Sequence, residues 1–298
     1  MLIITIIEYK RRTFLFYIDL FLVIILLIDL RNNFQWNSGS APGSVKSFKV
    51  INYNVAGFVK HPENAAKISD MLKEQHADIV CMQEYGFYDV TLGLKDTLSS
   101  YFSKELKMPY YKWFRQRDND FGLIIFSKYK FVKDSALFLH EKVMNAGVYC
   151  ELDVEGKRLG ILNFQLYSYN LNNQPYIPIL SLLRKTRQIN HIFQYVYKEQ
   201  EKEVQILLAK ARSLSFPVIL AGDFNNIPNS YFYHQLASSF NDSFMEKGRG
   251  RGITYPLMGI GIRIDYQFSS KNLKVLEHKV LESNFSDHYA LAVRYCFP

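Results

Sequence analysis

An apolar, β-branched run ends in an acid and an amide at Pro217-Val218-Ile219-Leu220-Ala221-Gly222-Asp223-Phe224-Asn225. A run of this kind, bounded by turn residues, predicts a buried strand. Asp223 and Asn225 are therefore expected where that strand ends, which is where functional groups are commonly mounted on a rigid scaffold. Because Gly-Asp-x-Asn is also a common turn sequence, the interpretation depends on the rest of the chain.

Five further short segments carry acids, amides or a histidine, and all six occur in a fixed order along the chain. The other five are Asn52-Tyr53-Asn54-Val55, Met82-Gln83-Glu84, Asn163-Phe164-Gln165-Leu166, Arg263-Ile264-Asp265-Tyr266 and Ser286-Asp287-His288. Four of the six follow runs rich in apolar and β-branched residues, so their polar groups are also expected at strand ends. A single short motif has a high false-positive rate, whereas the ordered set is far more specific.

The order and wording of the six segments resemble the endonuclease/exonuclease/phosphatase superfamily. This superfamily includes exonuclease III, apurinic endonucleases, pancreatic deoxyribonuclease, neutral sphingomyelinases and inositol polyphosphate 5-phosphatases. The resemblance covers about residues 46–298 and is densest over residues 217–266, where the chain is similar to bacterial members that often carry membrane segments at their N-terminus. It implies an α/β fold, a four-layer α/β sandwich with two packed mixed sheets flanked by helices.

Hydrophobic periodicity by itself indicates an α/β or α+β class. Apolar runs predict strands at residues 48–55, 78–83, 122–126, 148–152, 159–164, 217–221, 266–269 and 291–295. A helix is predicted to begin at Pro62, because apolar residues then recur on one helical side. A long helical stretch over residues 179–214 is expected to break near residues 198–202, where charge accumulates.

The resemblance implies a bound divalent cation, Mg²⁺ with Mn²⁺ as the alternative. Glu84 and Asp287 match the family positions that hold it. A hard cation of this kind prefers carboxylate and amide oxygens and keeps several waters, so one or two acids are enough. Asp223 and Asn225 match the acid and the amide beside the attacking water.

The remaining matched positions handle protons and phosphoryl charge. Asn54 matches the amide that fixes the catalytic groups, and His288 is expected to donate to a phosphoryl oxygen or exchange a proton, with Asp265 orienting its ring. Gln165 departs from many relatives, which carry histidine or tyrosine there, and an amide cannot become a cation. The expected catalytic set is Asn54, Asp223, Asn225, Asp265, His288 and Gln165.

Composition and charge agree with an enzyme that acts on anionic substrates. The chain has 298 residues, of which 48% are hydrophobic and 21% charged, and a formal net charge of +8. It shows no internal repeat or low-complexity tract. A positive field favours an anionic partner, but it does not choose among nucleic acid, a phosphoinositide and an anionic membrane surface. The expected partners are a phosphorylated substrate, which is a nucleic acid, phospholipid or inositol phosphate, and a membrane contacted through the N-terminal segment. Candidate anion contacts near the segments are Arg115, Arg117, Arg249, Arg251 and Arg263.

Three isolated cysteines, Cys81, Cys150 and Cys296, indicate neither a disulfide framework nor a zinc site. Cys81 lies inside an apolar run and is expected to be a small buried hydrophobe. The protein is expected to be a monomer.

The N-terminal segment is apolar over residues 14–30, except for Asp19 and Asp29, and it follows Lys10-Arg11-Arg12. Its seventeen residues are at the short limit for a membrane-spanning helix. An Asp near the middle opposes insertion by roughly 2.5–3.5 kcal/mol. We expect residues 1–36 to be an apolar membrane anchor or signal segment, residues 37–45 a linker, and residues 46–298 the catalytic domain. A helix that docks on the core is the structural alternative.

Basic residues predict the orientation of the anchor. Lys10, Arg11 and Arg12 outweigh Arg31 on the far side, so the positive-inside rule places the N-terminus in the cytoplasm. The protein is then single-pass, with its catalytic domain outside the cytoplasm. The alternative is a secreted or periplasmic protein.

Together these features predict a Mg²⁺-dependent hydrolase of phosphoester bonds, of the phosphodiesterase or phosphatase type. One alternative is an endonuclease that acts on DNA. Another is a catalytically silent domain that binds phosphorylated ligands. Catalysis is favoured over the silent domain, which would have no need to keep seven matched polar groups together.

Overall fold

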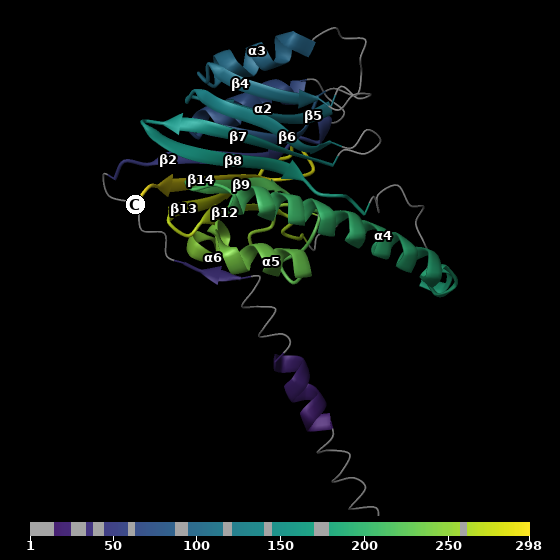
Figure 1. Cartoon of the computed structure of the whole chain (residues 1–298). Helices are drawn as coiled ribbons and strands as arrows, with labels where there is room; N and C mark the ends of the chain where they lie inside the picture. The colour runs from purple at the N-terminus through teal and green to yellow at the C-terminus, as the bar shows by residue number, and fades with distance from the viewer. Residues whose placement is uncertain are drawn as a thin grey trace, which may run out of the picture.

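Two six-stranded sheets packed face to face form the centre of the protein (Figure 1). The computed structural model describes residues 15–24, 34–37, 45–58, 63–86, 95–115, 121–139, 145–169, 179–256 and 261–298, without the side chains of 95–97 and 179–189. Each sheet mixes one parallel strand pair with antiparallel pairs.

The first sheet has the strand order β13-β14-β2-β3-β5-β4. Its strands are β2 (Phe48–Asn54), β3 (Ile79–Gly86), β4 (Tyr110–Arg115), β5 (Phe121–Ser127), β13 (Lys274–Leu281) and β14 (Ala290–Cys296). The helices on its outer face are α2 (Glu63–Glu74) and α3 (Lys95–Glu105), and a short 3₁₀ turn, η1 (Ala56–Phe58), follows β2. Ile68 and Leu72 of α2 and Phe102 of α3 belong to the core cluster on this face.

The second sheet has the order β10-β12-β9-β8-β7-β6. Its strands are β6 (Phe131–Leu139), β7 (Ala146–Val154), β8 (Lys157–Gln165), β9 (Val218–Asp223), β10 (Phe240–Asp242) and β12 (Asp265–Ser270). The helices on its outer face are α4 (Ile179–Arg212) and α5 (Tyr231–Ser239), and a short helix, α6 (Ser243–Lys247), follows β10. Leu207 of α4 and Phe232 of α5 pack on this sheet.

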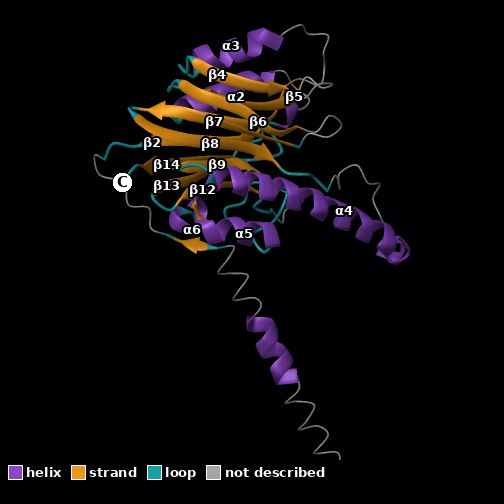
Figure 2. Cartoon of the chain, viewed as in Figure 1, coloured by secondary structure: helices purple, strands orange, loops and turns teal. Residues whose placement is uncertain are grey.

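A third core cluster lies between the sheets, so the layers run helices, sheet, sheet, helices (Figure 2). Cys81 and Ile125 contribute to it from one sheet, and Val148, Cys150 and Ile161 from the other. The expected four-layer α/β sandwich is confirmed. Cys81 is buried with a free thiol, also as expected.

The two parallel pairs bring the polar segments to one edge. Asn54 lies opposite Gln83 at the end of β2 and β3, and Gln165 lies opposite Asp223 at the end of β8 and β9. Gly222 is required at this point because a Cβ there would lie 2.1 Å from the carbonyl oxygen of Phe164 in the adjacent strand. The strand ends therefore meet where the sequence predicts them.

The break expected near residues 198–202 is wrong, because α4 is one continuous helix. Its charges are divided between two sides. Lys202 pairs with Glu199 on the exposed side at 2.7 Å. Gln200 and Glu203 are buried on the other side. Glu203 accepts from Asn145 and from the backbone N–H of Tyr167, so polar residues here support the helix.

The N-terminal segment is described in two pieces. Residues 15–24 form a helix whose side chains are all exposed, and it lies apart from the sheets in Figure 1. Among the residues described, no helix has the length and apolar character needed to cross a membrane. The rest of the apolar stretch, residue 14 and residues 25–30, lies outside the described residues, as do Pro62 and Arg117.

The second piece, β1 (Gln35–Trp36), pairs with β11 (Arg249–Gly250) in a two-stranded ribbon. Gln35 also donates from Nε2 to Sδ of Met245 in α6 at 3.2 Å. The residues just before the expected linker are therefore packed against the catalytic body.

Candidate active site

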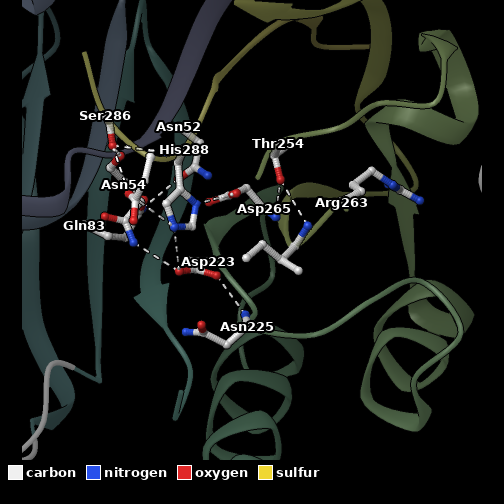
Figure 3. A network of polar contacts seen from close by, with 12 residues as sticks. Asn52, Asn54, Gln83, Asp223, Asn225, Thr254, Arg263, Asp265, Ser286 and His288 are labelled. Carbon is white, nitrogen blue, oxygen red and sulfur yellow. Dashed lines mark hydrogen bonds and ion pairs between the residues drawn. The ribbon is translucent and has the colours of Figure 1, made fainter. Parts of the chain in front are cut away.

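Polar groups from both sheets meet at the strand ends (Figure 3). β2, β3 and the segment before β14 supply Asn54, Glu84 and His288, whereas β8, β9 and β12 supply Gln165, Asp223 and Asp265. Three side-chain contacts, each crossing from one sheet to the other, join them: Asn54 with Asp223, Gln165 with Glu84, and His288 with Asp265.

His288 lies between two buried acids. Its Nδ1 is 2.9 Å from Oδ2 of Asp265, and its Nε2 is 3.9 Å from Oδ2 of Asp223. The backbone of Asp265 is fixed by Thr254, whose Oγ1 accepts from the N–H groups of Ile264 and Asp265 at 3.0 Å. The imidazole therefore has one nitrogen held by Asp265, while the other faces Asp223.

The environment of these side chains raises the pKa of both His288 and Asp223. Burial opposes the charged form of His288, but the carboxylates of Asp265 and Asp223 outweigh it and raise the pKa of the imidazole to about 10. Burial, reinforced by the charge of Asp265, raises the pKa of Asp223. At neutral pH the ring of His288 is therefore a cation, and Asp223 is a stronger base than an ordinary aspartate.

Asn54 joins the acids of the two sheets. Its Nδ2 donates to Oδ2 of Asp223 at 3.1 Å and lies 3.3 Å from Oε1 of Glu84. Its Oδ1 accepts from the backbone N–H of Ala56 at 3.0 Å, which fixes the amide orientation.

Glu84 occupies a strained backbone position. Its φ is 50°, in the left-handed region, and the β3–β5 register shifts between Met82 and Tyr85. A bulge of this kind re-aims a side chain, and such a conformation in a non-glycine residue costs on the order of 1–3 kcal/mol. Here it turns the Glu84 carboxylate toward Gln165, whose Nε2 donates to Oε1 at 2.6 Å.

Asn225 also has a left-handed backbone, with a φ of 49°. Its backbone N–H donates to Oδ1 of Asp223 at 2.8 Å, and its Nδ2 donates to the carbonyl of Leu166 at 2.9 Å. Asn225 thus closes a turn around Asp223 and ties the end of β9 to the end of β8.

Two groups of side chains could hold a cation. The ligand atoms of Asp223, Asp265 and His288 lie within 4.8 Å of one another, but a cationic imidazole offers no lone pair to a metal and offsets one of the two negative charges. Around Glu84 the amide N–H groups of Gln165 and Asn54 face Oε1, so the oxygens that could bind a hard cation are those of the Glu84 carboxylate and of the Gln165 amide. Oε1 of Gln165, next to Glu84, is buried and accepts no hydrogen bond among the described residues. The residues around Glu84 therefore fit Mg²⁺ or Mn²⁺.

Asp287 lies at the exposed rim, with 55% of its side chain accessible and its Oδ1 3.9 Å from Nε2 of His288. Among the described residues it makes no hydrogen bond with Glu84. The two expected ligands thus contact different members of the site. Glu84 lies beside Asn54, and Asp287 lies beside His288.

A buried amide network beneath the site was not anticipated. Nε2 of Gln83 donates to Oδ1 of Asn52 at 2.7 Å and to Oδ1 of Asn163 at 2.6 Å. Asn163 in turn donates to the carbonyls of Met82 and Ile124. These amides lie one or two residues before the expected site residues, and this spacing is the signal that could have identified them.

The sequence also did not identify Ser286 as a residue that positions the site. Its Oγ donates to the carbonyl of Asn54 at 2.8 Å and accepts from the backbone N–H of His288 at 3.2 Å. It therefore fixes the segment that carries Asp287 and His288 against the end of β2.

Arg263 is not an anion contact, because its guanidinium is buried. Nη1 of Arg263 donates to Oδ2 of Asp242 at 2.6 Å, and the guanidinium lies 4.4 Å from the ring centroid of Phe244 and 4.7 Å from that of Tyr266. The rings of Phe244 and Tyr266 cover the guanidinium, and the carboxylate of Asp242 neutralises its charge.

Arg263→Leu is expected to lower the free energy of unfolding by about 3–5 kcal/mol, the usual effect of leaving one member of a buried ion pair alone. Urea denaturation followed by circular dichroism measures this change. The matched control is Arg249→Leu, because Arg249 is exposed. If both variants unfold at the same urea concentration as the parent protein, the ion pair between Arg263 and Asp242 does not stabilise the fold.

The model of the Endonuclease/Exonuclease/phosphatase family matches residues 51–288. No curated protein sequence matches the chain. Among solved structures, a protein of the same family from Leptotrichia buccalis C-1013-b is similar with a TM-score of 0.61 and 20% identity, over 84% of this chain and 100% of that one. The human Nocturnin catalytic domain with bound sulfate gives 0.58 and 18%, over 90% and 98%. D. rerio TDP2 complexed with single strand DNA product gives 0.60 and 15%, over 85% and 100%. At these identities the structural likeness shows the fold.

Proposed function

Because the chain belongs to the Endonuclease/Exonuclease/phosphatase family and is therefore a metal-dependent phosphoester hydrolase, we propose that its cation is Mg²⁺, with Mn²⁺ as the alternative. The observation that best supports a working site is the ring of His288 between two buried acids, Asp265 and Asp223. A domain that bound phosphate without hydrolysis would need a cation, but would not need a second buried acid beside it.

In the proposed reaction Asp223 takes the proton of the attacking water. Its raised pKa makes it a better base near neutral pH than an ordinary aspartate. Asn225, two residues on, keeps the Asp223 carboxylate in place through its backbone N–H. Asn54 donates to the same carboxylate from the other sheet, so the base is held from both sides.

His288 is the proposed electrophilic group. With Nδ1 held by Asp265, the cationic ring can donate from Nε2 to a phosphoryl oxygen on which negative charge accumulates. The charge of the imidazolium is maintained by Asp265 despite its burial.

Glu84 and Asp287 are the proposed holders of the cation. The cation, when bound, would polarise a phosphoryl oxygen and neutralise part of its charge. Glu84 supplies a carboxylate whose direction is set by its backbone conformation and by the hydrogen bond from Gln165.

Glu84→Gln is expected to lower kcat/KM at limiting Mg²⁺ by at least about tenfold, because a hard cation binds a charged carboxylate much better than an amide. The side chains have nearly the same size, so the fold should persist. The measurements are Mg²⁺ titration by calorimetry and turnover of a generic phosphodiester. Unchanged values in both would remove Glu84 from the ligand set.

Gln165→Ala is expected to weaken Mg²⁺ binding by about 10–100-fold, the usual effect of removing a group that orients a metal ligand. Gln165→Glu should instead bind Mg²⁺ more tightly than Gln165→Ala, since the cation would offset the repulsion between the new carboxylate and Glu84, whose Oε1 lies 2.6 Å from Nε2 of Gln165. Calorimetry of the two variants separates this role from turnover. Equal Mg²⁺ affinity in all three proteins would show that Gln165 does not act through Glu84.

For the substrate we propose a phosphodiester or phosphomonoester of nucleic acid, phospholipid or inositol phosphate. The net charge of +8 favours an anionic partner. A DNA endonuclease is the second candidate, supported by the similarity to D. rerio TDP2, whose structure contains a single strand DNA product. A panel of plasmid DNA, RNA, sphingomyelin, inositol phosphates and a generic diester, each assayed with Mg²⁺ and with chelator, distinguishes these substrates. Cleavage of DNA alone would favour the endonuclease.

We further propose that residues 14–30 tether the protein to a membrane with the catalytic body outside the cytoplasm. In its support, all ten side chains of residues 15–24 are exposed, and nine of them are apolar. Protease added to intact cells or spheroplasts should then cleave the body. Recovery of the full-length chain in the soluble cytosolic fraction would contradict the tether.

A further inference from the structure

We propose, building on the membrane tether above, that the β1–β11 ribbon is a seat by which the catalytic body rests on an anionic lipid bilayer. The ribbon consists of Phe34, Gln35, Trp36, Arg249 and Gly250. It is the first part of the body that follows the apolar N-terminal segment, and β1 pairs with β11 antiparallel, with Trp36 opposite Arg249. Its position fixes which face of the body is turned toward the membrane.

The aromatic part of the ribbon is exposed. Trp36 is 82% accessible, and its ring lies against that of Phe34 with the centroids 4.6 Å apart. Tryptophan is enriched at the boundary between bilayer and water, where its ring is apolar and its N–H remains hydrated. An exposed tryptophan next to an apolar N-terminal segment therefore fits the headgroup level of a bilayer.

The basic part of the ribbon lies beside this ring. Arg249 is exposed opposite Trp36, and Arg251, also exposed, is oriented by a hydrogen bond from Nη2 to the carbonyl of Gly261 at 3.3 Å. Each basic residue close to an anionic leaflet strengthens its attraction about fivefold. The combination of an aromatic ring and guanidinium groups selects an anionic bilayer over a neutral one.

The geometry of the chain also allows this contact. Residues 24 and 34 are ten steps apart, which span at most about 35 Å of extended chain. If residues 14–30 lie in the membrane, the ribbon cannot be far from its surface. The ribbon is in turn fixed to the body, because Gln35 bonds to Met245 of α6 and α6 packs on β12 and β13.

The seat is close in sequence to the active site. Four residues separate Arg249 from Thr254, and the side chain of Thr254 accepts from the backbone N–H of Asp265. A body seated through β11 would thus present the site at a fixed height above the lipid headgroups. Such an arrangement suits a substrate carried on or near the membrane surface.

The chain has two tryptophans, Trp36 and Trp113, so Trp113→Phe leaves Trp36 as the single fluorescent probe. The full chain is reconstituted into nanodiscs of brominated phosphatidylcholine, with and without phosphatidylglycerol. We expect the bromine atoms to reduce Trp36 fluorescence at least about twofold in the anionic discs. The Trp36→Phe chain, which retains the partly buried Trp113, should show no such loss.

Arg249→Glu in the Trp113→Phe background tests the charge. Replacing a basic residue by an acid should reduce the quenching in anionic discs to the level in neutral discs. The matched control is Lys67→Glu, which makes the same change at an exposed position of α2, on the outer face of the first sheet. This control should keep the full quenching.

Two further measurements separate failure of the seat from failure of the proposals beneath it. Turnover of a generic phosphodiester reports the hydrolase, and it should be unchanged in the Trp36→Phe and Lys67→Glu variants. Flotation with vesicles reports the tether. If the chain floats but Trp36 remains unquenched, the ribbon does not contact the bilayer, whereas the proposed membrane tether is supported. If the chain does not float, both the tether and the ribbon contact are wrong, and the proposed hydrolase activity is not affected.

Discussion

Asp223→Asn and His288→Ala are each expected to lower kcat about a hundredfold to ten-thousandfold, the range contributed by positioned acid and base groups. Asp223→Asn keeps the size of the side chain and can still accept one of the two hydrogen bonds that Asn54 and Asn225 donate, but it removes the base. His288→Ala removes the cation between Asp223 and Asp265, so two buried acids are left facing each other.

Steady-state turnover of a generic phosphodiester with saturating Mg²⁺ measures this loss, and thermal melting shows whether the variants remain folded. The matched controls are Asp70→Asn and His234→Ala, at exposed positions of α2 and α5. If folded Asp223→Asn and His288→Ala proteins retained the rates of their controls, the proposed assignment of the base and the electrophile would be wrong.

Asp265→Asn is expected to lower kcat by a similar factor, although Asp265 acts only through His288. Burial alone opposes the charged imidazole, and the carboxylate of Asp265 is the first group that outweighs it. Asparagine cannot neutralise the imidazolium, and it can also turn its amide N–H toward Nδ1, which would favour the wrong tautomer. The ring would then be neutral at pH 7 and unable to stabilise phosphoryl charge.

NMR of the His288 imidazole distinguishes this positioning role from general loss of structure. The resonances should show a cationic ring at pH 7 in the parent protein and a neutral ring in Asp265→Asn. The Thr254→Ser protein retains the hydroxyl that accepts from Asp265 and should keep the cation and most of the activity. A cationic ring in folded Asp265→Asn would show that Asp265 does not control the charge of His288.

The central strands and the position of the site were predictable from the sequence. β2, β3, β8 and β9 are buried on both faces, so they appear as continuous apolar runs. β4, β6 and β13 were not predicted because they are edge strands with exposed residues, where apolar periodicity is weak. The same limit explains the expected break in α4, since charge alone does not reveal which polar residues are buried and hydrogen-bonded.

The contacts that shape the site were less accessible to prediction. Glu84 directly follows the apolar run that predicts a strand over residues 78–83, and the sequence shows no sign that its backbone is left-handed. The pairing of Arg263 with Asp242 joins the segment before β12 to the end of β10, and it depends on these two strands lying side by side in the second sheet. The motif match identified Arg263 as a neighbour of Asp265, but only packing shows that its charge is buried.

Asp223 and Asp265 of the second sheet reach Asn54 and His288 of the first only across the boundary between the sheets, and this has a consequence for biosynthesis. Neither half of the sandwich contains an acid, a base and an imidazole in working order, so the chain cannot hydrolyse anything until the segment that carries His288 has docked against Asp265. Folding is thereby the activation step. A cell that exports this protein unfolded would be protected from its activity during synthesis, without a separate inhibitor.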